Sequence, residues 1–144
     1  MQYHLNEGSF SLSGDDWQDT SMNVLRDDVS GITMVVSRGA IPEGSDFEQE
    51  FHRQWDSMRP QMKQLQQSEF QRVSVGQRKH IRGVQVSSQF ERNGQKLFQH
   101  QLAVQAKDKP VLMVFTYSAL RPFDAEDEAR WDALKNTLSI GLDA

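Results

Sequence analysis

The sequence predicts an α+β fold in which helices pack against an antiparallel β-sheet, within a single domain spanning residues 1–144. Three observations predict this fold. The first third of the chain consists of short β-type runs separated by turn residues, an amphipathic helix pattern follows, and three long β-type runs precede a last helix pattern. A chain of 144 residues is long enough to bury its own hydrophobic core.

Short strands are expected in the N-terminal third. Glycines punctuate this region, and the segment from Asp27 to Gly31 is typical of a turn between two strands. In residues 34–37, apolar side chains fall on both faces of the expected strand. A strand buried on both faces lies inside a sheet, so we expect an internal strand here.

The strongest helix pattern runs from Asp46 to about Gln67, and Ser45 with Glu48 is typical of a capping box at its start. Its apolar residues recur at spacings of three and four: Phe47, Phe51, Trp55, Met58, Met62 and Leu65. Pro60 lies inside the pattern, and proline either kinks or breaks a helix. Because the apolar stripe keeps its phase across Pro60, we expect a kink rather than two separate elements.

Three long strands are expected next, over residues 70–75 continuing into 80–92, then 95–107, then 111–118. Asn93-Gly94 is a strong signal for a β-hairpin, and residues 108–110 form the following turn.

The length of the loop at Asn93-Gly94 decides the register of this hairpin. A two-residue loop places Val86 opposite Gln101 and mixes apolar and polar residues on both faces, whereas a bulged loop places Val84 opposite Leu102. The bulged register gathers one apolar face: Val84, Val86, Phe98, Leu102 and Val104. It also gathers one polar face: Gln85, Ser87, Gln89, Gln99, Gln101 and Gln105. We expect the bulge because it buries more apolar surface.

The last helix is predicted to begin at Asp124, a good N-cap residue, with acidic residues in its first turn. Trp131, Leu134 and Leu138 form its expected buried stripe, and Gly141 is the expected stop.

The net charge of −4 argues against a nucleic-acid interface and against docking on an anionic membrane, both of which need basic patches. The chain contains no cysteine and no apolar run of membrane-spanning length, so we expect no disulfide, no thiolate site and no membrane insertion. The N-terminus lacks the basic start and apolar run of a secretion signal, which favours a cytoplasmic location.

No pattern in the sequence predicts catalysis, a metal or a cofactor. The four histidines, His4, His52, His80 and His100, lack the spacing of metal ligands, and His100 is expected as a hydrogen-bonded histidine of the core. The carboxylates cluster where turns and helix starts are expected, and no nucleophile or phosphate-binding motif is present. We therefore expect a protein that is not an enzyme.

Five segments of the N-terminal region follow a characteristic order: NEGSF at 6–10, WQD at 17–19, MNVL at 22–25, VVSR at 35–38 and IPEG at 41–44. In this order they resemble the DcrB-like family and, within it, the Eag chaperones of bacterial type VI secretion. The later order of helix, strands and helix also fits, so the resemblance covers the whole chain. It implies a PsbP-like sandwich fold. Periplasmic DcrB-like relatives would carry an export signal, and this chain departs from that pattern.

The Eag resemblance implies a homodimer that binds the N-terminal transmembrane helices of a secreted toxin effector of the PAAR or Rhs type, shields them and aids loading on the secretion spike. It implies no cofactor. The groove residues expected on family pattern and strand alternation are Met22, Val24, Val35, Ser37, Leu65, Gln99 and Gln101. If the sheet face is inverted, Met34 and Val36 replace Val35 and Ser37.

Two further readings stay open. The Gln-rich sheet face is either a solvated surface or the floor of a groove that holds a helix through neutral hydrogen-bonding groups, which are cheaper to desolvate than charges. As an alternative function, the chain could be a PsbP-like ligand-binding or envelope-associated module without catalytic activity. A hydrolase that uses scattered carboxylates is the second alternative function, which no motif supports.

Overall fold

A seven-stranded antiparallel sheet forms the centre of the computed structural model, which describes residues 1–141. The strand order is β3-β4-β9-β8-β7-β5, with β6 also paired to β7. The strands are β1 (Gln2–His4), β2 (Ser9–Ser11), β3 (Asn23–Asp27), β4 (Ile32–Ala40), β5 (Lys63–Gln67), β6 (Gln71–Val75), β7 (Ile81–Arg92), β8 (Gln95–Gln105) and β9 (Val111–Ala119). The helices are α1 (Phe47–Met58), the 3₁₀ turn η1 (Arg59–Gln61) and α2 (Ala125–Thr137).

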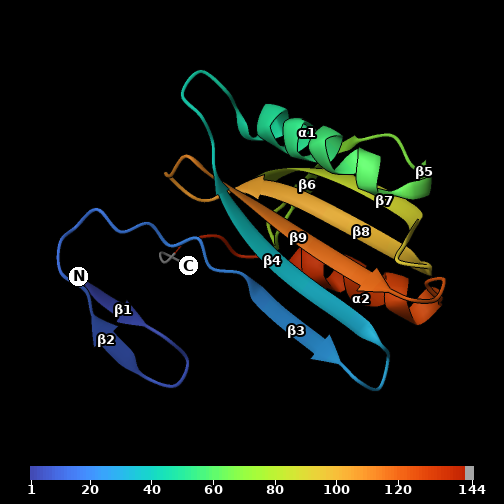
Figure 1. Ribbon diagram of the computed structural model, residues 1–144, viewed down its shortest axis with the longest axis horizontal. Coiled ribbons are helices and arrows are strands. Elements are labelled where there is room, and N and C mark those ends of the chain that lie inside the picture. Colours follow the sequence, from blue (N-terminus) through green and yellow to red (C-terminus); the bar gives the residue numbers. More distant parts are fainter. Residues whose placement is uncertain (142–144) are drawn as a thin grey trace.

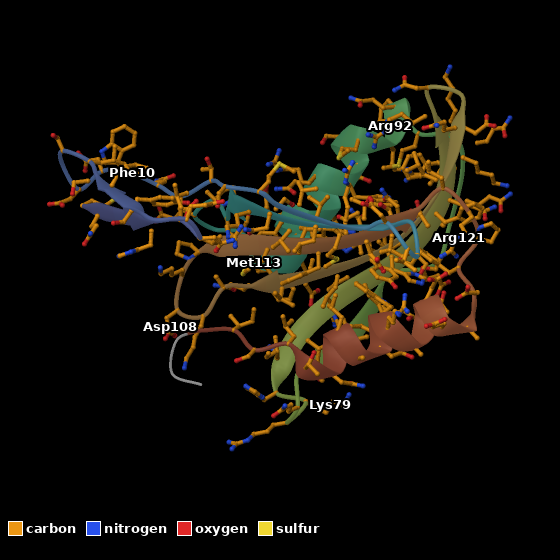
Figure 2. The ribbon with its side chains drawn as sticks, turned by 90° about the horizontal axis from the view of Figure 1, so that it is seen from below. Phe10, Lys79, Arg92, Asp108, Met113 and Arg121 are labelled. Carbon is orange, nitrogen blue, oxygen red and sulfur yellow. The ribbon has the colours of Figure 1, made fainter. Side chains whose placement is uncertain are left out.

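The predicted α+β fold is confirmed, with a helix on each face of the sheet. Figure 1 shows α1 along one side of the sheet and α2 behind it, and Figure 2 shows the sheet between the two helices. β4 lies between β3 and β9, as expected for an internal strand. The PsbP-like label stays a prediction.

The main helix ends at Met58, two residues before Pro60, and the expected kink is wrong. After α1 and one 3₁₀ turn the chain changes direction, and β5 pairs with β7. Proline lacks an N–H and its ring clashes with the preceding turn, so the helix cannot continue through it without losing backbone hydrogen bonds. Met58 is consequently 43% exposed instead of buried. The capping box is also shifted by one residue, because Asp46 and Gln49 form it.

The β7–β8 hairpin has the two-residue loop, and the expected bulge is wrong. Phe90 pairs with Leu97, and Val86 pairs with Gln101. Asn93 and Gly94 both have positive φ angles, 55° and 79°, as a tight hairpin turn requires. Because each face of the sheet is covered by a helix, this register gains burial on both faces and needs no single apolar face.

The core therefore divides into two clusters, one on each face of the sheet. On the α1 side, Phe51 and Trp55 pack against Val84, Val86 and other strand residues. On the α2 side lie the buried residues Ile32, Val75, Leu102, Val104, Phe115, Tyr117, Ala119 and Trp131. The expected Gln-rich face is split accordingly: Gln99, Gln101 and Gln105 lie on the α1 side, while Gln85, Ser87 and Gln89 lie on the α2 side.

α2 begins where the sequence predicts, with Asp124 as its N-cap residue. Asp127 completes the capping box and is 2% exposed. It also accepts two hydrogen bonds from Arg121, whose guanidinium donates to the carbonyl of Ser30 as well. This network joins α2 to the β3–β4 turn. α2 ends at Thr137 with Leu138 as its C-cap, so Gly141 is not the residue that stops it.

We expect Asp127→Asn to lower the free energy of unfolding at neutral pH by about 2 kcal/mol. The hydrogen bonds from Arg121 lower the pKa of the buried Asp127 carboxyl from 3.8 to about 2. This contribution is complete above pH 3.8 and is lost as the pH falls through about 2, so the difference between the variant and the unmodified chain should shrink in acid. Urea unfolding at pH 7 and in acid measures it.

Asp132→Asn is the matched control, since Asp132 lies on the same helix with a side chain that is 66% exposed. Its ion pair with Lys135 is at the surface, so a change below about 1 kcal/mol is expected. An equal loss in both variants would contradict the role assigned to Asp127.

Candidate functional site

Small and neutral polar side chains cross the α1-side face of the sheet in two adjacent rows. The strand register places Thr33, Ser118, Gln99 and Ser88 in one row from β4 to β7. The neighbouring row contains Val24, Val35, Thr116, Gln101 and Val86. We call these two rows the polar rows. None of these side chains carries a charge. The charged neighbour at the β3 end is Arg26, which pairs with Thr33.

Three buried side-chain oxygens in the polar rows have no hydrogen-bond partner: Ser88 Oγ, Gln99 Oε1 and Gln101 Oε1. Ser88 is 8% exposed and Gln99 is 9% exposed, so water reaches them poorly. The amide of Gln101 donates to Thr116 Oγ1 at 3.0 Å, which leaves its carbonyl oxygen free. An unpaired buried polar group costs about 1–3 kcal/mol, so three of them on one face make this face a candidate site, where added hydrogen-bond donors would be favourable.

The structure brings most of the predicted groove residues onto this face. Val24, Val35, Gln99 and Gln101 belong to the polar rows, and Ser37 lies on the same face opposite Val114. Met22, just before β3, is 62% exposed, and Val24 is 59% exposed. They place apolar surface beside the polar rows.

Leu65 comes to this side from β5, where it packs against the α1-side core. The residues of the inverted choice, Met34 and Val36, pack against the α2-side core instead.

Four polar members of the polar rows were not predicted as groove residues from the sequence: Thr33, Ser88, Thr116 and Ser118. Ser88 alternates with Val84 and Val86 along β7, so the bulged register would have placed it opposite Phe98, whereas it pairs with Gln99. The other three are small polar residues in otherwise apolar strands, which is a weak signal until the register places them side by side.

A second polar cluster, on the α2 side, surrounds His100. Its Nδ1 lies 2.7 Å from Ser87 Oγ, and its Nε2 lies 2.9 Å from Glu128 Oε1. Its ring stacks on Phe123 at 4.4 Å and lies near Trp131 at 5.6 Å. Ser, His and Glu in this order resemble a hydrolase triad, but Ser87 lies within a regular strand and its N–H is bonded to Ser68 Oγ, so this group supplies no oxyanion-binding amide. The cluster joins α2 to the sheet.

An open cavity of about 870 Å³ lies near the start of α1, away from the polar rows, and is lined in part by Phe47, Arg72, His80 and Arg82. Its two carboxylates, Asp46 and Glu48, already have partners, because Glu48 pairs with Arg72 at 3.0 Å within the lining and Asp46 caps α1. Within residues 1–141, no group of three histidine or acidic side chains is placed to hold a metal ion.

Comparison with protein families identifies the chain. A model of the DcrB family matches residues 7–137. The chain belongs to the DcrB family. The crystal structure of PA94, a Pseudomonas aeruginosa protein of unknown function for which a regulatory role is suggested, is 21% identical to this DcrB-family chain, with a TM-score of 0.74. The match covers 99% of this chain and 97% of PA94, and at this identity it shows a shared fold.

No curated protein matches this member of the DcrB family. In the part of the chain that the structure describes, neither helix has the length and apolar character needed to cross a membrane.

Two adjacent serines of this DcrB-family chain test the meaning of the unpaired oxygens. We expect Ser88→Ala to raise the free energy of unfolding by about 1 kcal/mol, because it removes a buried hydroxyl that has no partner. Ser87→Ala is the matched control on the opposite face, and it should lower stability by about 1 kcal/mol because it breaks the hydrogen bond to His100. Chemical denaturation measures both, and a loss of stability in Ser88→Ala would show that this hydroxyl is satisfied within the monomer.

Proposed function

We propose that this DcrB-family chain is an Eag-type chaperone that binds the N-terminal transmembrane helices of a type VI secretion effector of the PAAR or Rhs type. In this proposal it acts in the cytoplasm as a homodimer, shields the helices and aids their loading on the secretion spike. It uses no cofactor and performs no catalysis. The observation that carries the proposal is the set of three unpaired oxygens in the polar rows.

A transmembrane helix outside a membrane presents about 20 apolar residues to water and would aggregate. Such helices associate in membranes through close packing of small residues and through hydrogen bonds from serine, threonine and glutamine. The polar rows offer the same chemistry, with Ser88, Gln99 and Gln101 as acceptors and apolar side chains such as Val24 and Val35 between them. Their neutrality suits this ligand, because lysine or glutamate would cost more to bury.

The unpaired oxygens of the polar rows also support the function of a carrier that later releases its ligand. In the free protein the three oxygens remain unpaired, so the ligand gains hydrogen bonds on entry, while exposed Met22 and Val24 supply adaptable apolar contacts. The alternative of a ligand-binding accessory module draws its support from the cavity of about 870 Å³ near α1. That cavity has a charged rim, which suits a small polar ligand better than an apolar helix.

We expect this chain to be recovered in a stable complex with the N-terminal segment of a spike-associated effector encoded beside it, when the two are co-expressed and analysed by pull-down and size exclusion. The same effector without its apolar helices should not be recovered. Equal recovery without the helices would move the interaction to another part of the effector, and no recovery with either would favour the ligand-binding alternative.

Gln99→Met should weaken binding of the effector segment by roughly tenfold, because it removes an acceptor from the polar rows while keeping the side-chain volume. Gln89→Met is the matched control, since Gln89 is the neighbour of Phe98 on the opposite face and bonds to Gln66. Titration of the purified chaperone with a detergent-solubilised effector segment measures both. Equal weakening in the two variants would contradict the assignment of the α1-side face.

A further inference from the structure

The open cavity of about 870 Å³ near the start of α1 is separate from the polar rows. Along β8, Gln105 lines the cavity and Gln101 belongs to the polar rows, with the fully buried Ala103 between them on the same face. The volume of the cavity falls within the range of about 300–1,000 Å³ that is typical of sites for small molecules. A ligand in this cavity therefore need not compete with a helix bound along the polar rows.

The lining of the cavity has an excess of positive charge, although the chain as a whole carries a net charge of −4. Three cationic side chains stand against two carboxylates: Arg72, Arg82 and Lys107 against Asp46 and Glu48. A concave surface lined by one sign of charge concentrates ions of the opposite sign. The cavity therefore favours an anion.

Arg82 is available to such an anion. It lies on the α1-side face, two residues before Val84 of the core, and its side chain is exposed. Within residues 1–141 its guanidinium makes no ion pair and no hydrogen bond, whereas Arg72 pairs with Glu48 at 3.0 Å. A guanidinium presents parallel N–H donors in a planar fork that matches a carboxylate or a phosphate. Arg82 can therefore bind an oxyanion without first breaking an internal contact.

Hydrogen-bonding side chains flank Arg82 on both neighbouring strands. Ser74 of β6 pairs with it directly, and Gln105 of β8 lies opposite it when the register of Gly83 with Val104 is continued by one residue. Directly opposed residues share a face of the sheet, with Cα atoms about 4.5–5.5 Å apart. The amide of Gln105 donates to the carbonyl of Lys109 at 2.9 Å, which holds this wall in place. The hydroxyl of Ser74 can donate to an anion that Arg82 binds.

The cavity also has an apolar lining, which comes from three separate parts of the chain. Phe47 opens α1, Ile81 opens β7 and Ile140 follows α2, and each of them is partly buried. Sites for small molecules combine apolar walls with a few polar groups that fix the orientation of the ligand. An inorganic ion would leave these walls without a contact, so the lining favours an anion with an apolar body.

We propose that this cavity binds a small organic anion, with its carboxylate or phosphate on Arg82 and Ser74 and its apolar body on Phe47, Ile81 and Ile140. The site goes beyond the proposed function and does not rest on it, because it uses none of the residues of the polar rows. The two are therefore tested separately.

The probe for this site is α-naphthyl phosphate, which joins an anionic group to an aromatic body. In isothermal titration calorimetry on the full chain, we expect one probe to bind per chain, at least about tenfold more tightly than inorganic phosphate or α-naphthol, each of which has only one of the two features. Added NaCl should weaken this binding. A parallel titration with α-naphthoate shows whether a carboxylate or a phosphate is the preferred group.

Arg82→Gln should raise the dissociation constant of α-naphthyl phosphate by about tenfold or more, because it removes the charged fork. Arg92→Gln is the matched control, since it removes the same charge from the other end of β7, about 33 Å away along an extended strand. Figure 2 labels Arg92 far from Lys79, which lies in the turn before β7. The control should bind the probe as the natural chain does, and circular dichroism verifies that both variants are folded.

Absence of saturable binding of both naphthyl anions, or equal weakening in Arg82→Gln and Arg92→Gln, would overturn the proposed site. Inorganic phosphate that binds as tightly as α-naphthyl phosphate would overturn the role of the apolar lining. A chain that binds the probe through Arg82 but recovers no effector segment would instead refute the proposed function and leave this site standing.

Discussion

The two-residue turn at Asn93-Gly94 is the constraint on which the rest of the sheet depends. It fixes β7 against β8, and β8 in turn carries β9 and β4 in register. Side chains alternate across a sheet with a period of two, so a shift of one residue would exchange the faces of every pair. This turn therefore places Ser88 beside Gln99, and it brings polar groups of several strands into the same two rows.

Two helices make that register stable although it mixes apolar and polar residues on both faces. α1 covers part of one face with Phe51 and Trp55, and α2 covers the other with Trp131. Pro60 has a structural role here, because it ends α1 and frees the following residues to form β5 beside β7. A longer helix in place of β5 would leave the part of β7 from Ser88 to Glu91 without its strand partner, while β6 would still pair with the part before it.

The α1-side face departs from the usual rule that buried polar groups are paired, whereas the polar cluster of the α2 side follows it. His100 has partners on both ring nitrogens, and Asp127 is bonded to Arg121 and to the backbone at the start of α2. Ser88, Gln99 and Gln101 keep unpaired oxygens on the face opposite. Natural proteins break such local rules most often at functional sites, so this contrast within one sheet supports the α1-side face as the candidate site.

The sequence by itself determined most elements and their order, because Asn93-Gly94, Asp124 and the apolar periodicities act locally, but it assigned the residues of β5 to the main helix. It also identified Val24, Val35, Gln99 and Gln101 as candidates, through strand alternation and family resemblance. Only the tertiary structure decided the break at Pro60, the hairpin register and the joining of Ser88, Thr116 and Ser118 to the site. These depend on which surfaces each residue meets across the sheet, and energies of long-range contact cannot be read from neighbours in the chain.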